Sequence, residues 1–111
     1  MPLLNISTNK EIKNEKILLA KSSDFISFLL AKEENFVMVK LMHSMPMYFA
    51  GSDELCAFIE IKSIGSLFPS KMSKPICDFF STELKIPSER IYIFFDDVNS
   101  RQWAWNSKTF G

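Results

Sequence analysis

The chain has 111 residues, the length of one domain, and its 13 basic and 13 acidic residues cancel. It lacks the positive surplus of a nucleic-acid binder or a polybasic membrane anchor, and no apolar run approaches the roughly 20 residues of a membrane span. No signal-peptide pattern opens the chain, so we expect a single cytoplasmic domain over residues 1–111 with no nucleic-acid or membrane partner.

The first part of the chain predicts a strand, a helix and a second strand. Residues 2–7 (PLLNIS) suit a short strand, and Thr8 with Glu11 fits the capping-box pattern that starts a helix. Apolar residues then recur at nearly helical spacing over 12–31. FVMVKLM, at 36–42, is rich in the residues that favour a strand.

The second part of the chain repeats this order. Amphipathic spacing predicts a helix within 70–85, but Pro75 lies inside that window. The helix either begins near Ser73, with the proline in its first turn, or bends at the proline. Flanking strands are predicted at 54–65 and 91–97, with one more short strand at 103–105 (WAW).

A doubled βαβ unit predicts an α+β fold, with a four-stranded mixed sheet and two antiparallel helices on one face. The other face of the sheet then has no cover from the chain itself. With eleven phenylalanines and 47% apolar residues, the strands are expected to be apolar on both sides. We therefore expect this face to be buried against other subunits.

Cysteine and histidine are too sparse to suggest a metal site or a disulfide framework. Cys56 and Cys77 lie far apart in the sequence, and His43 is the only histidine. We expect no metal and no cofactor, and cysteines that serve as small buried apolar residues.

Three stretches carry a resemblance to a known family: MPLLNISTN at the start, AGSDELCAFIEIKSIG in the middle, and ERIYIFFDDVN with WAWNSKTFG at the end. Together, and in this order, they resemble the macrophage migration inhibitory factor family. That family belongs to the tautomerase superfamily, whose members use an amino-terminal proline. The resemblance runs in register over essentially the whole chain.

The resemblance implies a homotrimer in which three sheets form an inner β-barrel, with an active site at each subunit interface. The catalytic proline falls on Pro2, the carboxylate-binding lysine on Lys32, and a backbone contact to the substrate on Ile64. The neighbouring subunit would contribute Tyr92, and Phe94 stands where mammalian members have an asparagine, which makes the pocket more apolar. The remaining pocket walls fall on Phe36, Trp103, Trp105 and Phe110.

The resemblance also implies keto–enol tautomerisation of phenylpyruvate-type aromatic α-keto acids, with dopachrome-like compounds as further candidate substrates. The reaction needs a base with a pKa near neutrality that can also return the proton. An α-amino group titrates at about 7.7–8.0, and we expect burial beside Lys32 to lower the pKa of a terminal Pro2 amine. Met1 must first be removed, because the Pro2 nitrogen is otherwise an amide.

Each of these residues, taken alone, also has an ordinary structural explanation. Pro2 suits the start of a strand, Lys32 suits a helix C-terminus, and Tyr92 suits a core or an interface. Two alternatives to the enzyme therefore stay open. One is a cytokine-like signalling or binding protein with a vestigial pocket, and the other is a structural trimer without activity.

Overall fold

The computed structural model describes all residues from Met1 to Gly111. Its main elements in chain order are β1 (Leu3–Thr8), α1 (Glu15–Leu30), β2 (Met38–Met42), β3 (Ala57–Ser63), α2 (Pro69–Leu84), β4 (Ile91–Asp97), β5 (Ala104–Trp105) and β6 (Lys108–Thr109). Three single-turn 3-10 helices precede β2, β4 and β5, namely η1 (Glu34–Phe36), η2 (Ser88–Arg90) and η3 (Ser100–Gln102). None of the helices is long and apolar enough to cross a membrane.

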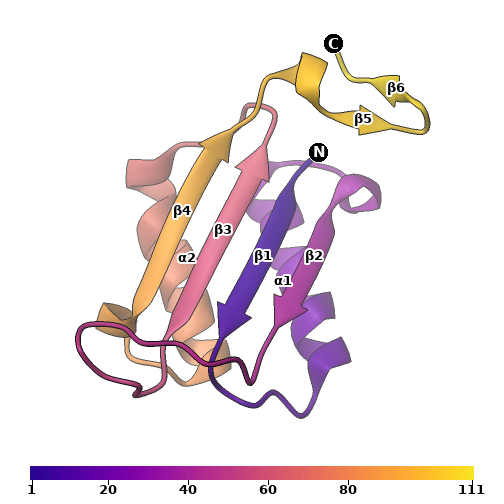
Figure 1. The fold of residues 1–111 in the computed structure, drawn as a ribbon. Helices are drawn as coiled ribbons and strands as arrows, with labels where there is room; N and C mark the ends of the chain where they lie inside the picture. Colours follow the sequence, from indigo (N-terminus) through magenta and orange to yellow (C-terminus); the bar gives the residue numbers. More distant parts are fainter.

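The four long strands form one mixed sheet in the order β2-β1-β3-β4. β1 pairs in parallel with β2 and antiparallel with β3, and β3 pairs in parallel with β4. Both helices lie behind this sheet in Figure 1, while the β5–β6 hairpin extends beyond the end of the sheet at which the N-terminus lies. The predicted α+β fold, with its doubled βαβ unit, is confirmed.

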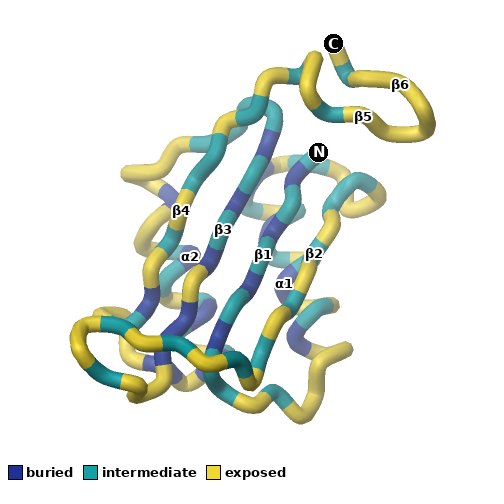
Figure 2. Tube along the Cα trace, in the orientation of Figure 1, coloured by how far each residue is buried: buried dark blue, intermediate teal, exposed yellow.

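The core lies between the sheet and the helices. Alternate residues of β1 and β3 point into it, and Figure 2 shows that the buried positions concentrate in these two central strands and in the helices. Each helix buries a stripe of residues spaced by four. The two stripes are Leu18, Ser22, Ile26 and Leu30 in α1, and Met72, Ile76, Phe80 and Leu84 in α2.

The two helices also end in the same way. Ala31 and Lys85 take left-handed backbone conformations, with φ of 53° and 55°, directly after α1 and α2. Ser27 Oγ donates to the Lys32 carbonyl at 2.6 Å, as Ser81 Oγ does to the carbonyl of Ile86. Position 32 in the first half is therefore the structural counterpart of position 86 in the second.

Both helices start at residues other than those that the sequence patterns predict. α1 begins at Glu15, because Thr8 is still paired in β1 and its hydroxyl donates to the Cys56 carbonyl at 2.8 Å instead of capping a helix. α2 begins at Pro69, whose fixed φ suits the first helical position, and continues through Pro75. Of the two predicted alternatives, a start near Ser73 is therefore wrong, and the helix includes Pro75 in its interior.

The strand predictions differ from the structure only at their ends. The predicted strand at 91–97 coincides with β4, whereas those at 36–42 and 54–65 are shortened to β2 and β3. The WAW segment forms β5, which pairs with β6 in a hairpin.

The uncovered face of the sheet carries three rows of four side chains, because residues in register across the strands share a face. The rows, from β2 to β4, are Met38, Leu3, Lys62 and Asp96; Lys40, Asn5, Glu60 and Phe94; and Met42, Ser7, Phe58 and Tyr92. The face is thus mixed rather than uniformly apolar as predicted. Its middle is polar, with Asn5 Nδ2 donating to Glu60 Oε1 at 3.1 Å.

Candidate active site

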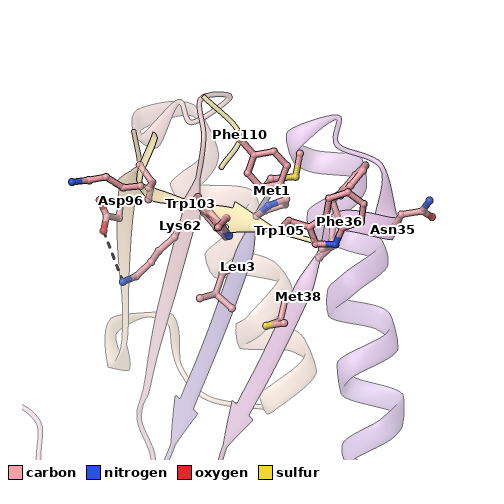
Figure 3. A pocket seen from close by; sticks show the side chains of 15 residues that line it. Met1, Leu3, Asn35, Phe36, Met38, Lys62, Asp96, Trp103, Trp105 and Phe110 are labelled. Atoms are coloured by element: carbon pink, nitrogen blue, oxygen red, sulfur yellow. Dashed lines mark ion pairs between the residues drawn. The ribbon is translucent and has the colours of Figure 1, made fainter. Parts of the chain in front are cut away.

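A cavity of about 630 Å³ lies where the first of these rows meets the N-terminus, η1 and the C-terminal hairpin. Figure 3 shows the side chains of Met1, Phe36, Trp105 and Phe110 gathered around it. Ten of its fifteen lining residues are hydrophobic. The cavity is therefore largely apolar, as pockets for small aromatic molecules usually are.

Pro2 lies in the wall of this cavity and is fully buried. Its carbonyl accepts a hydrogen bond from the Met38 N–H at 3.0 Å, so the residue is fixed between the starts of β1 and β2. Met1 lines the same cavity. The amino end of the chain thus opens into an apolar pocket from a rigid position.

The surroundings favour a neutral amine at this end of the chain. Burial lowers the pKa of the Met1 α-amino group, and the nearby positive charge of Lys32 lowers it further. Both causes act against the protonated form. An amine at this place is therefore more readily available as a base at neutral pH than an ordinary chain terminus.

Lys32 and Ile64 lie next to each other, although they are 32 residues apart in the sequence. Lys32 follows the left-handed turn at Ala31, and its Nζ donates to the carbonyl of Ile64 at 3.2 Å. Neither residue belongs to the lining of the cavity within one chain. Their proximity places an ammonium group beside the half-buried backbone at Ile64, and an ammonium group is a suitable partner for a carboxylate.

The aromatic walls come from two separate parts of the chain, η1 and the C-terminal hairpin. Phe36 in η1 meets Trp105 of the hairpin edge to face, with ring centroids 5.5 Å apart. The Phe110 N–H donates to the Trp103 carbonyl at 3.0 Å and folds the last residues back over the cavity. The structure therefore brings together Pro2 and the four predicted wall residues of the same chain.

Tyr92 and Phe94 lie elsewhere in the same chain. Tyr92 is at the start of β4, in the row that ends the sheet farthest from Pro2, and Phe94 is in the middle row. Their side chains are 62% and 48% exposed on an edge strand. They can contribute to a cavity of this kind only if they reach it from a second copy of the chain.

Sequence patterns did not point to the polar side of the cavity. Lys62 and Asp96 line it from the sheet, 4.0 Å apart across β3 and β4 (Figure 3). Gln102 lines it from η3. The alternation of side chains along β3 and β4 indicates only on which face of the sheet these two side chains lie. Their position beside Pro2 depends on the strand register, which local spacing does not reveal.

No group of three or more histidine, cysteine, aspartate or glutamate side chains in the chain could hold a metal ion. His43 lies outside the cavity lining and bonds to Glu15 through Nε2, while Cys56 is buried at the start of β3. The groups that line the cavity thus include the terminal amine, one ion pair and several aromatic rings, and the Lys32 ammonium lies outside the lining but near the amine. This set suits the transfer of a proton on an apolar substrate.

Residues 1–111 match the family described as Macrophage migration inhibitory factor (MIF). The chain belongs to the macrophage migration inhibitory factor family. The macrophage migration inhibitory factor homolog of Brugia malayi is 33% identical over 115 residues, with both chains fully covered. The macrophage migration inhibitory factor of Xenopus tropicalis is 28% identical over 114 residues, with 99% of each covered.

Solved structures of the family share the fold of this chain. The homologue from Prochlorococcus marinus superposes with a TM-score of 0.91 at 38% identity, covering 98% of this chain and 99% of that one. The protein from Trichinella spiralis gives a TM-score of 0.87 at 31% identity, covering 97% and 99%. The sheet, the helices and the C-terminal hairpin are thus those of the macrophage migration inhibitory factor family.

Proposed function

We propose that the chain is a keto–enol tautomerase of phenylpyruvate-type aromatic α-keto acids, in which Pro2 acts as general acid and base after removal of Met1. The observation that carries this proposal is the fixed, buried Pro2 in the wall of an apolar cavity lined by aromatic rings. Membership of a family within the tautomerase superfamily supports it.

The reaction moves one proton between the carbon beside the ketone and the ketone oxygen. In the enol-forming direction the neutral Pro2 nitrogen takes the proton from carbon, a carbon–carbon double bond forms, and the carbonyl electron pair moves onto oxygen. A proton from solvent water then adds to that oxygen, and in the reverse direction the enol hydroxyl returns its proton to solvent. In the reverse direction the Pro2 ammonium returns a proton to carbon, so the same group serves as base and acid.

Lys32 and Ile64 would hold the carboxylate of the substrate. The Lys32 ammonium now donates to the Ile64 carbonyl, and it can offer its other hydrogens to an anion beside it. The same positive charge stabilises the negative charge that develops on the enolate. Phe36, Trp105 and their neighbours would pack against the aromatic ring and exclude water.

The complete site requires a homotrimer under this proposal. The uncovered face leaves large apolar side chains exposed, among them Met38, Met42 and Tyr92, at 61%, 51% and 62%. Closing three sheets into an inner barrel would bury this face and bring Tyr92 and Phe94 of one copy toward the cavity of another. Sedimentation at low micromolar concentration should give roughly 38 kDa, three times the 12.8 kDa chain, and a folded monomer would contradict the trimer.

A cytokine-like signalling role is the second candidate, because the family that matches the whole chain takes its name from an effect on macrophages. In that case the cavity would be vestigial and the trimer surface would carry the function. Such a protein would bind partners equally well with or without a free Pro2 nitrogen.

The test compares two forms of the protein whose N-termini have been verified by mass. One begins at Pro2, and the other keeps Met1 or carries one added alanine before Pro2. The trimmed form should turn over phenylpyruvate, and the extended form should lose roughly 10²–10³-fold or more, because its Pro2 nitrogen is a non-basic amide. Equal turnover by both forms would overturn the proline mechanism.

A further inference from the structure

Asp97, the last residue of β4, has no part in the steps described so far. Its Oδ1 accepts a hydrogen bond from the Gly65 N–H at 3.0 Å, across 32 residues of sequence. The next residue, Val98, donates its N–H to the Ser63 carbonyl at 2.8 Å. The end of β4 therefore holds the turn that follows β3 at two points, one on each side of Ile64.

This turn has a backbone that requires such support. Gly65 and Ser66 both have left-handed conformations, with φ of 72° and 63°. Two successive residues in this region are unusual, and a serine there is less favourable than a glycine. The Asp97 carboxylate bonds to the first of these two residues, directly after Ile64.

The same turn contains the only hydrogen-bond acceptor that the structure shows for the Lys32 ammonium. Lys32 Nζ donates to the Ile64 carbonyl at 3.2 Å, so a shift of the Ile64 peptide also removes the acceptor of the lysine. Asp97, Ile64 and Lys32 thus form a continuous chain of contacts. The neighbouring Asp96 is not part of it, since its side chain points to the other face and pairs with Lys62.

We propose that Asp97 is a positioning residue for the substrate carboxylate: by holding the Gly65 amide it fixes the Ile64 backbone and, through the Ile64 carbonyl, the Lys32 ammonium. This inference rests on the proposed function, because it takes Ile64 and Lys32 as the carboxylate site. Asp97 touches neither the substrate nor the Pro2 nitrogen. Its removal should therefore weaken recognition of the carboxylate much more than the proton transfer itself.

The experiment compares D97A with D97N in the trimmed, full-length protein. The asparagine keeps an oxygen that can accept from the Gly65 N–H, whereas alanine does not. D97A should raise KM for phenylpyruvate roughly tenfold with kcat changed less, and D97N should stay within about twofold of wild type. For phenylpyruvate methyl ester, which lacks the negative charge, wild type and D97A should have similar KM values.

A second measurement is independent of turnover. Trp103 and Trp105 are the only tryptophans and both line the cavity, so quenching of their fluorescence by phenylpyruvate reports binding directly. The dissociation constant should rise roughly tenfold in D97A and return in D97N. If D97A does not fold, Asp97→Ser, whose side chain is too short for the bond, takes its place.

The outcomes separate the two proposals. A wild-type protein without turnover overturns the proposed function. A wild-type protein that turns over phenylpyruvate, with D97A binding it as tightly as D97N, overturns the positioning role. An equal effect of D97A on the acid and on its ester also overturns it, because a general loosening of the fold would explain that result. Rescue by asparagine together with selectivity for the acid supports the role.

Discussion

The two halves of the chain share a backbone but differ at equivalent positions. After α1 the left-handed turn leads to Lys32, and after α2 the same turn leads to Ile86, which is 1% exposed in the core. One half thus presents a positive charge where the other presents an apolar side chain. The repeated backbone stabilises the fold in both halves, whereas the chemistry depends on residues that break the repeat.

The starts of the two central strands show the same contrast. Pro2 precedes β1 and lies in a cavity. Cys56 precedes β3, and its N–H and carbonyl are both bonded, to Asn9 Oδ1 at 2.9 Å and to the Thr8 hydroxyl at 2.8 Å. At the matching place the second half therefore has a buried residue whose N–H is already bonded, and not a chain-terminal amine.

The last residues of η1 and η2 differ as well. Phe36 ends η1 and forms a wall of the cavity, while Arg90 ends η2 and fixes a loop. The Arg90 guanidinium donates to the carbonyls of Phe49, Glu54 and Leu55 at 2.9–3.0 Å and to that of Ser52 at 3.4 Å. At the ends of these two 3-10 helices, the first half thus contributes a wall of the cavity and the second half a side chain that holds a loop in place.

The largest expected effect comes from giving position 86 of the second half the positive charge that Lys32 carries in the first half. Ile86→Lys puts an ammonium group into the core with no partner, so we expect the free energy of unfolding to fall by about 3–5 kcal/mol. Urea denaturation measures it. An unchanged midpoint of urea denaturation would show that the side chain at position 86 is not buried in the core.

Pro2→Gly removes the ring but leaves a free primary amine after removal of Met1. We expect turnover of phenylpyruvate to drop roughly 10²–10³-fold, the usual contribution of one well-placed base. The matched control is Cys56→Ser at the start of β3, which should stay within a few-fold of wild type. Similar losses in both variants, with folding intact, would contradict the assignment of the base.

Lys32→Ile gives the first half the residue type of its counterpart. Loss of one charge-assisted hydrogen bond should reduce kcat/KM for phenylpyruvate roughly 10- to 100-fold, through a higher KM as well as a lower kcat. The melting temperature should change little, because the Lys32 ammonium bonds only to the Ile64 carbonyl. A loss of stability without a change in KM would assign Lys32 a purely structural role.

Arg90→Ala has the smallest expected effect and concerns the second half alone. Without the guanidinium, the loop around Phe49 loses four hydrogen bonds and the cation–π contact at 5.1 Å, which we expect to cost about 1–2 kcal/mol of stability. Arg90→Lys should not restore it, since one ammonium cannot reach all four carbonyls. Full rescue by lysine would show that charge alone matters there.

Much of the fold could be predicted from local patterns. The run of β-branched and aromatic residues at 91–97 fixes β4, and apolar residues spaced by four fix the buried face of α2. The buried face of α1 is less predictable, because it includes Ser22 while the apolar Ile17 and Phe28 are exposed. The helix starts could not be predicted in the same way. Thr8 matches a capping pattern, but pairing with β3 keeps it in the strand, and long-range pairing is absent from local spacing.

The candidate site, like the fold, could be predicted from the sequence only in part. Pro2, Phe36 and the tryptophans were singled out from the resemblance, and the structure places them around one cavity. Lys62 and Asp96 line that cavity because of the strand register, which local sequence patterns do not reveal. The Asp97 bond to Gly65 joins segments 32 residues apart through a conformation of the turn that only the folded chain defines.

The pH dependence of kcat/KM tests the central claim most directly, namely that the amine of the first half is the base. The base must be neutral, so the rate should rise with pH through the pKa of the Pro2 nitrogen in the free enzyme. Burial and Lys32 lower the pKa of an amine at this end of the chain, and Pro2 lines the same cavity as Met1. For protein verified to begin at Pro2, the midpoint of the acid limb should therefore lie below the ordinary α-amino value of about 7.7–8.0. A midpoint at or above that value, or no acid limb at all, would contradict the account.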